Sequence, residues 1–226
     1  MLYWMVGARR ANYNFGLQHA ADRAKELGVG LVIFEPLRVD YPWASERHHS
    51  AIIAGMRDNQ KAFARTKALY YPYIEPTPGA GQGLLLALAR RACLVVTDES
   101  PGFFLPRMQQ AASEKLSISL VFVDSNGIYP IHATERVFTT AASFRRHLQK
   151  ELPEHFAHVP LKNPLASRSL REPPALDYKL QRAWPSARLE DIDDLGHLPI
   201  DHRVSPLAMP SGPNAARKAL RTFLST

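Results

Sequence analysis

Polar and aromatic side chains follow several apolar segments of this sequence, where they could bind a small molecule. Two arginines and two asparagines follow the first segment, and an aromatic residue and a carboxylate end the second. Together these groups supply cationic donors, amides, acceptors and an aromatic surface, which suits a planar, polar or anionic ligand. The candidate binding residues are Arg9, Arg10, Asn12, Asn14, Phe34, Glu35, Asp98, Glu99, Asp124 and Asn126.

Each candidate also has a purely structural interpretation. Arg9 and Arg10 suit a solvated loop, Asn14 suits a helix N-cap, and Asp98 could cap the following helix or turn. The argument for binding is their shared position, because all of them are expected at strand ends. The sequence leaves both interpretations open.

Other familiar chemistries find little support. The stretch PGAGQG at 78–83 lacks the lysine and the serine or threonine of a phosphate loop, and we interpret it as a flexible turn. His48 and His49 are adjacent rather than four residues apart, so we interpret both as structural. The single cysteine, Cys93, lies at the start of an apolar run and is expected to be a buried thiol. We predict no catalytic residue and no metal site.

Hydrophobic periodicity indicates the elements that must position these residues. Residues 2–5 and 30–35 are short apolar runs typical of buried strands, and a helix begins near Asn14 and stops at Gly28. Further strands are expected at 69–74, 92–97 and 118–123, and further helices at 45–67, 84–91 and 104–116, with another that carries Phe144, Leu148 and Leu152.

This alternation of strands and helices predicts an α/β fold. Parallel neighbours require helical crossovers, so we expect a doubly wound, five-stranded, mostly parallel sheet in the order 3-2-1-4-5, flanked by helices. Ligands of such sheets bind beyond the carboxyl ends of the strands, where the strand order reverses. That point lies between the loops after the first and fourth strands.

The composition changes after Pro153. Ten of the eighteen prolines fall between Pro153 and Pro213, and no sustained period runs through this stretch. We divide the chain into an α/β domain at 1–156, a Pro-rich interdomain linker at 157–210 and a C-terminal helix within 211–226. An apolar stripe on that helix includes Leu220 and Phe223 and has no obvious partner in the sequence.

Charge and hydropathy indicate the kind of partner and the cellular location. The formal net charge of +7 favours a polyanionic partner. No apolar run approaches the length of a membrane span, and no leader pattern precedes the first strand. We expect a cytoplasmic protein without a membrane partner.

Several motifs resemble the class II cyclobutane pyrimidine dimer photolyases of the photolyase/cryptochrome family. The opening YWMVGARRANYNFGL is similar to YWM-S-R-xx-R-xx-DNWAL, and VVTDESP is similar to VTDFSP. The stretches ERHHSAIIAGMRDNQKAF, VDSNGIYPIHATE and FRRHLQKELPEHF resemble further family segments in the same order. The last helix, PSGPNAARKALRTFL, resembles the helix that opens the family's flavin-binding half.

The resemblance implies an N-terminal domain that holds an antenna chromophore, commonly a deazaflavin or a folate. In the family, a C-terminal helical domain binds FAD and UV-damaged DNA, and light-driven electron transfer splits the dimer. That half has no counterpart in this sequence, so the resemblance implies FAD and DNA contact only through a missing helical domain, and no repair by this chain alone. The missing domain, or a partner chain, is expected to cover the last helix.

The sequence differs from the family pattern at several positions. Tyr13, Phe15 and Glu99 replace an aspartate, a tryptophan and an aromatic residue, and Glu99 adds negative charge near the expected pocket. The alternative interpretation is a stand-alone nucleotide- or ligand-binding or interaction module of photolyase-like fold, without enzymatic activity.

Overall fold

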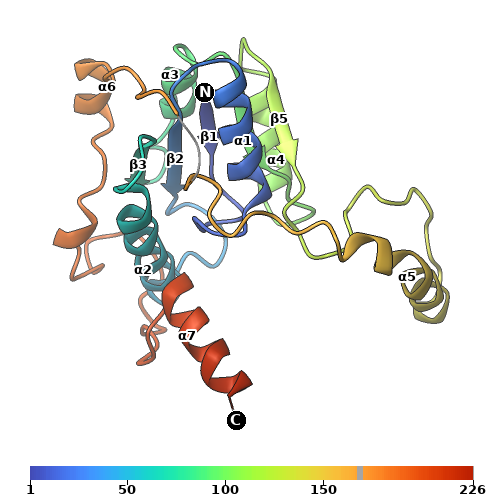
Figure 1. Ribbon diagram of the computed structural model, residues 1–226. Helices are drawn as coiled ribbons and strands as arrows, with labels where there is room; N and C mark the ends of the chain where they lie inside the picture. Colours follow the sequence, from blue (N-terminus) through green and yellow to red (C-terminus); the bar gives the residue numbers. More distant parts are fainter. Residues whose placement is uncertain (167–169, 226) are drawn as a thin grey trace.

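The computed structural model describes residues 1–166 and 170–225 and contains a five-stranded parallel sheet (Figure 1). The strand order is β3-β2-β1-β4-β5, which confirms the predicted order. Every pairing is parallel, and β1 lies at the centre, where Tyr3 is level with Ile33 on one side and with Val96 on the other. The strands are β1 (Leu2–Trp4), β2 (Val32–Leu37), β3 (Leu69–Ile74), β4 (Val95–Asp98) and β5 (Leu120–Val123).

Side-chain caps define where several helices begin. Asn14 Oδ1 accepts a hydrogen bond from the backbone N–H of Leu17 at 2.8 Å, and Ser45 and Thr140 cap later helices in the same way. The helices are α1 (Phe15–Glu26), α2 (Glu46–Phe63), α3 (Leu84–Ala89), α4 (Leu105–Ser113), α5 (Ala141–His155), α6 (Tyr178–Ala183) and α7 (Pro213–Leu224), with a 3-10 turn, η1, at Leu189–Asp191.

The alternation of side chains along β1 separates two layers of core. Tyr3 and Met5 pack on the face that α1 covers, whereas Leu2 and Trp4 pack on the opposite face with α3 and α4. Both faces of β1 are therefore buried, as a central parallel strand requires. The carboxyl ends of all five strands meet at one edge of the sheet (Figure 1).

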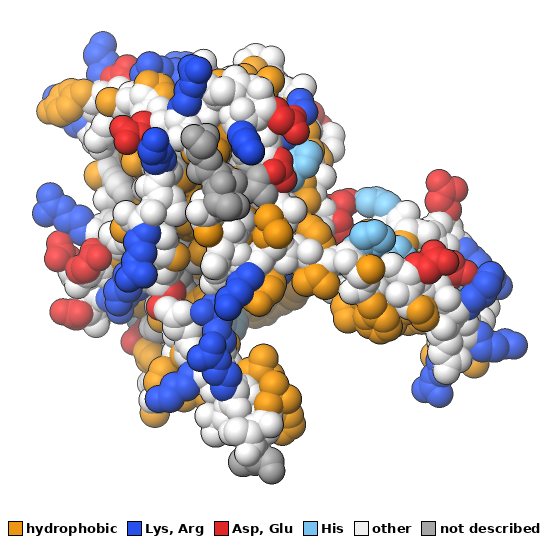
Figure 2. Space-filling view, viewed as in Figure 1, with side chains coloured by type: hydrophobic (Ala, Val, Ile, Leu, Met, Phe, Trp, Pro, Cys, Tyr) orange, Lys and Arg blue, Asp and Glu red, His pale blue; other side chains and the backbone are white. Residues whose placement is uncertain are grey.

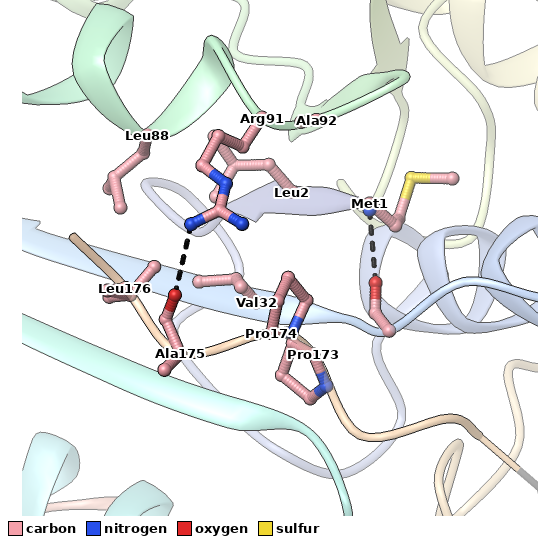
Figure 3. A pocket seen from close by; sticks show the side chains of 11 residues that line it. Met1, Leu2, Val32, Leu88, Arg91, Ala92, Pro173, Pro174, Ala175 and Leu176 are labelled. Carbon is pink, nitrogen blue, oxygen red and sulfur yellow. Dashed lines mark hydrogen bonds between the residues drawn. The ribbon is translucent and has the colours of Figure 1, made fainter.

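The Pro-rich segment packs closely against the sheet domain. Its buried leucines each contribute about 1.5 to 3 kcal/mol relative to exposure. Trp184 donates from Nε1 to the carbonyl of Ala80 at 2.9 Å, and Pro173 lies directly against Gly30. Figure 3 shows residues 173–176 along the amino-terminal edge of the sheet, where Arg91 donates to the carbonyl of Ala175 at 3.2 Å. The buried leucines are Leu165, Leu170, Leu180, Leu189, Leu195 and Leu198.

The structure corrects the expectation for Cys93. This cysteine is exposed and lies in the connection before β4, not inside a strand. Pairing with β1 starts only where Val95 meets Leu2, so the apolar run that begins at Ala92 enters the sheet three residues later than predicted. The helices α2 and α3 likewise end before their predicted limits, at Phe63 and Ala89.

Two helices extend from the body of the molecule (Figure 1). Helix α5 carries no buried residue and lies beyond the β5 edge. Helix α7 contacts α2 through its first turn, where the backbone N–H of Asn214 donates to Asp58 Oδ2 at 2.9 Å. Leu220, on the predicted apolar stripe, is 56% exposed. Within residues 1–166 and 170–225, no helix combines the length and apolar character needed to cross a bilayer.

Candidate functional site

A groove lies at the carboxyl edge of the sheet, on the face covered by α3 and α4. It consists of two adjoining cavities of about 180 and 400 Å³ that share residues at the end of β2 and on α4. We call it the carboxyl-edge groove. Its combined size falls in the range of ligand sites, and its position matches the edge at which doubly wound sheets bind ligands. The residues common to both cavities are Pro36, Leu37, Arg38 and Met108.

Aromatic side chains form much of the larger cavity. Trp4, Phe34 and Tyr73 line it and are at most 5% exposed. The indole nitrogen of Trp4 is buried and has no hydrogen-bond partner among the described residues. A buried donor without a partner costs about 1 to 3 kcal/mol, so this nitrogen is a local cost to folding, and the ring of Trp4, not its N–H, is what borders the cavity.

One buried carboxylate joins two of the loops beside this cavity. Glu75, at the end of β3, accepts from the backbone N–H of Gly81 at 3.0 Å and from that of Val39 at 3.2 Å. It is 3% exposed. The Gly-rich stretch expected to be a flexible turn is indeed a turn, but Gly79, Gly81 and Gln82 of it line the cavity. Glu75 therefore gives this wall of the groove a defined position.

A second buried carboxylate holds Arg9 beside the smaller cavity. Glu35 is fully buried, and Arg9 donates to its Oε1 at 3.3 Å and to the carbonyl of Pro36 at 2.6 Å. Asn59 and the hydroxyl of Tyr70 donate to the other oxygen at 3.0 and 2.6 Å. Burial, followed by the charge of Glu35, raises the pKa of Tyr70. Both terminal nitrogens of the Arg9 guanidinium group therefore donate hydrogen bonds within the protein.

The other arginine of the groove is also paired. Arg38 makes a two-pronged contact with Asp40, at 2.8 and 2.6 Å. This hydrogen-bonded partner lowers the pKa of the Asp40 carboxyl. Because both Arg9 and Arg38 already face a carboxylate, the groove carries little unbalanced charge. Its chemistry favours a flat ring system with polar edges over a highly charged ligand.

Exposed aromatic residues stand beside the smaller cavity. Trp43 and Phe103 are 68% and 80% exposed and meet edge to face at 5.7 Å between ring centroids. Both have positive φ, 69° and 63°, which costs a bulky residue about 1 to 3 kcal/mol. Their neighbours Tyr41 and Phe104 stack on each other and line the cavity. The groove therefore has an aromatic rim on two loops.

Two predicted binding residues are engaged in holding the first loop. Asp98 accepts from the backbone N–H groups of Val6, Gly7 and Ala8 at 3.2, 2.9 and 3.0 Å, and from the hydroxyl of Tyr3 at 2.6 Å. Asp98 is 1% exposed. Burial, followed by the charge of Asp98, raises the pKa of Tyr3 well above its usual value.

Asn14 completes the same network from the other side. It is fully buried, and its amide nitrogen donates to the carbonyls of Ala8 and Arg10 at 2.8 and 3.0 Å. A Cβ on Gly16 would lie 2.8 Å from Asp98 Oδ1, so only glycine fits beside this pair. For Asn14 and Asp98 the structure therefore shows contacts that build the loop.

The remaining predicted residues lie apart from the groove. Arg10 donates to the carbonyl of Tyr13, and Asn12 contacts Lys162, Asn163 and Arg217 on the α1 and α2 face. Near the end of β5, Asn126 donates to the carbonyl of Glu99 at 2.7 Å and to Asp124 at 3.1 Å. Of the ten candidates, only Arg9 and Phe34 line the carboxyl-edge groove.

Sequence reasoning did not identify Trp4, Arg38, Tyr73 and Glu75 as groove residues. Trp4 carried a usable signal, because alternation along β1 places it opposite Tyr3, on the face of α3 and α4. Glu75 directly follows the third strand. Glu35 and Asp98 were selected as candidates because they lie at strand ends, and the same criterion would have selected Glu75. Residues within 79–85 line the groove because their turn folds back over β3, and this fold of the turn cannot be predicted from the local sequence.

Other parts of the structure offer less. The crevice of Figure 3 lies at the amino-terminal edge of the sheet. Its volume of about 40 Å³ is too small for a chromophore. Within the described residues, no group of three or more His, Cys, Asp or Glu side chains could hold a metal ion.

Comparisons with known proteins bear on the family. No protein-family model matches the chain. A deoxyribodipyrimidine photo-lyase of Methanothermobacter thermautotrophicus is 28% identical over 163 residues, which is 72% of this chain and 35% of that protein. A crystal structure of a universal stress protein in complex with cAMP aligns with 55% of this chain and 96% of that protein's chain, at 16% sequence identity. The TM-score of 0.35 is too low to indicate a shared fold. The chain is similar to this photo-lyase over most of its own length and spans about a third of the length of that relative.

Proposed function

We propose that this chain is the N-terminal antenna-type domain of a class II-like DNA photolyase and that it acts in light-dependent repair of cyclobutane pyrimidine dimers. The observation that carries this proposal is the match to a deoxyribodipyrimidine photo-lyase across 72% of the chain. The chain spans only 35% of that relative. Dimer splitting, FAD and damaged DNA are therefore assigned to the complete photolyase, and the isolated chain is not expected to repair DNA.

The carboxyl-edge groove is the proposed chromophore site. A deazaflavin or a folate is flat, has polar edges and requires an aromatic cavity of several hundred Å³. The larger cavity, with about 400 Å³ and walls that include Trp4, Phe34 and Tyr73, fits this requirement. When bound, such a chromophore absorbs light and passes the excitation energy to a flavin.

The residues of the chain have distinct roles in this proposal. Trp4 and Phe34 supply flat apolar surface against the ring system. Glu75 holds the glycine-rich wall, and Arg38, oriented by Asp40, borders the cavity. Excluding water from the aromatic walls strengthens each polar contact within them.

A chromophore titration of the purified chain tests the site. A deazaflavin and a folate are added separately, and binding is followed by ligand absorbance. Phe34→Leu removes an aromatic ring from the wall of the larger cavity and is expected to weaken binding about 2- to 12-fold, the value of one aromatic contact of about 0.5 to 1.5 kcal/mol. Phe156→Leu makes the same chemical change at an exposed position at the end of α5, outside the groove, and serves as the control. Equal binding by both variants would place the chromophore elsewhere.

The repair role is tested on the native protein. The chromosomal copy is tagged, the tagged protein is purified with whatever is attached to it, and a thymine-dimer oligonucleotide is incubated with it in light and in darkness. We expect repair in light only, and a flavin absorbance in the purified material. Native material that contains the chain but lacks flavin and repair would favour the alternative, a stand-alone ligand-binding or interaction module.

A further inference from the structure

A second cavity, of about 340 Å³, lies on the other face of the sheet domain, between α2, the first loop and the start of α7. We call it the basic crevice. Unlike the carboxyl-edge groove, it is lined mainly by polar side chains. Figure 2 shows Lys and Arg side chains gathered over α2 and α7 on this side of the molecule. The lining includes Asn12, Asp58, Lys61, Arg65, Asn214 and Arg217.

Three cations enter the basic crevice from two elements distant in sequence. Lys61 lies in the last turn of α2 and Arg65 lies just beyond the end of that helix, and both line the crevice. Both are exposed, and neither has a hydrogen-bond or ion-pair partner among the described residues. Arg217, on α7, is oriented by a hydrogen bond from its Nη2 to Asn12 Oδ1 at 2.8 Å.

The carboxylate in the crevice is already neutralised in part. Asp58 Oδ2 accepts from the backbone N–H of Asn214 in the first turn of α7, where the helix dipole favours negative charge. Three cations therefore face one carboxylate that is engaged elsewhere. The helix dipole favours a cation in the last turn of α2, which explains the position of Lys61. It does not explain the other two cations, because Arg65 lies beyond the end of α2 and Arg217 lies on α7.

We propose that the basic crevice binds a phosphate group. Paired Arg and Lys side chains with neighbouring amides form the donor set that phosphate oxygens require. The overall charge of +7 favours phosphates carried by a nucleic-acid backbone, and a free phosphate compound shares the same chemistry. This proposal does not depend on the photolyase assignment, because it concerns a different face and needs neither light nor a chromophore.

The experiment measures binding of the full chain to a fluorescent, undamaged DNA duplex across a salt series, with inorganic pyrophosphate titrated separately by calorimetry. The pocket variant is Lys61→Gln/Arg65→Gln. The control is Arg107→Gln on α4 with Lys115→Gln just beyond its end, which changes net charge equally on the opposite face of the sheet. All four residues are exposed, so both variants should fold.

If the backbone of DNA is the ligand, the pocket variant lowers the slope of log affinity against log salt by about 2, since each lost phosphate contact removes about 0.9. The control variant keeps the wild-type slope to within about 0.5. If the duplex does not bind but pyrophosphate binds wild type and control and not the pocket variant, the crevice takes free phosphate compounds. Failure of both probes to bind wild type, or equal losses in the two variants, would overturn the proposal. None of these results depends on repair activity.

Discussion

Removing the carboxylate of Asp98 should destabilise the whole sheet domain. In the wild type, one of its oxygens accepts from three backbone N–H groups of the first loop, and the other accepts from Tyr3. Asp98→Ala removes the acceptor of the three backbone N–H groups and leaves the Tyr3 hydroxyl with its 3.2 Å contact to Asn14 Oδ1. At about 1 to 3 kcal/mol for each unsatisfied group, reduced where water can enter, we expect a loss on the order of 4 kcal/mol. Domains of this kind are stable by about 5 to 15 kcal/mol, so the effect is large.

Asp98→Asn separates the contribution of charge from that of shape. The amide keeps one acceptor oxygen for the loop but loses the negative charge and the acceptor for Tyr3. Charge-assisted hydrogen bonds are about twice as strong as neutral ones, so we expect a loss of about 2 kcal/mol. Glu99→Ala, at the adjacent and partly exposed position, should cost no more than about 1 kcal/mol.

Urea unfolding followed by tryptophan fluorescence measures these differences as free energies of unfolding. The expected order of stability is wild type, then Glu99→Ala close to it, then Asp98→Asn, then Asp98→Ala. An Asp98→Ala protein within about 1 kcal/mol of wild type would refute the view that Asp98 builds the first loop.

Two further predictions concern single hydrogen bonds. Tyr70→Phe removes a donor from the buried carboxylate of Glu35 and should lower the free energy of unfolding by about 1.5 to 3 kcal/mol, measured in the same urea titration; no measurable loss would contradict the Glu35 network. The hydrogen bond to Glu99 raises the pKa of His132, so its stabilising contribution is present below pH 6.5 and is lost as the pH rises through the folded value. An NMR titration should show the His132 pKa above 6.5 in the wild type and nearer 6.5 in Glu99→Gln, whereas identical values would show that the pair does not form in solution.

Much of the fold could be predicted because its signals are local. Apolar runs such as 30–35 and 69–74 can be recognised without knowing their neighbours, and the lengths of the intervening helices require parallel crossovers. The position of the ligand edge follows from the strand order. Cys93 was assigned wrongly because an apolar run shows that a strand is near, but not at which residue its pairing begins.

The roles of the polar residues could not be predicted in the same way. A carboxylate after a strand looks the same in sequence whether it faces a ligand or the backbone of a neighbouring loop. Asp98 faces three N–H groups of residues more than ninety positions earlier, and Asn12 faces Arg217 rather than the groove. Such partners are set by long-range packing, which periodicity does not encode.

The sequence by itself determined the α/β class, from hydrophobic period, and the edge at which the groove would lie, because parallel strands share one carboxyl edge; the expected strand order needed the structure to establish it. Only the tertiary structure decided which side chains line that groove. Trp4 and Glu75 reach it through the pleat of β1 and the fold of the 79–85 loop over β3. It also decided that Lys61 and Arg217 share a crevice, since contact between helices distant in sequence depends on the packing of the whole domain.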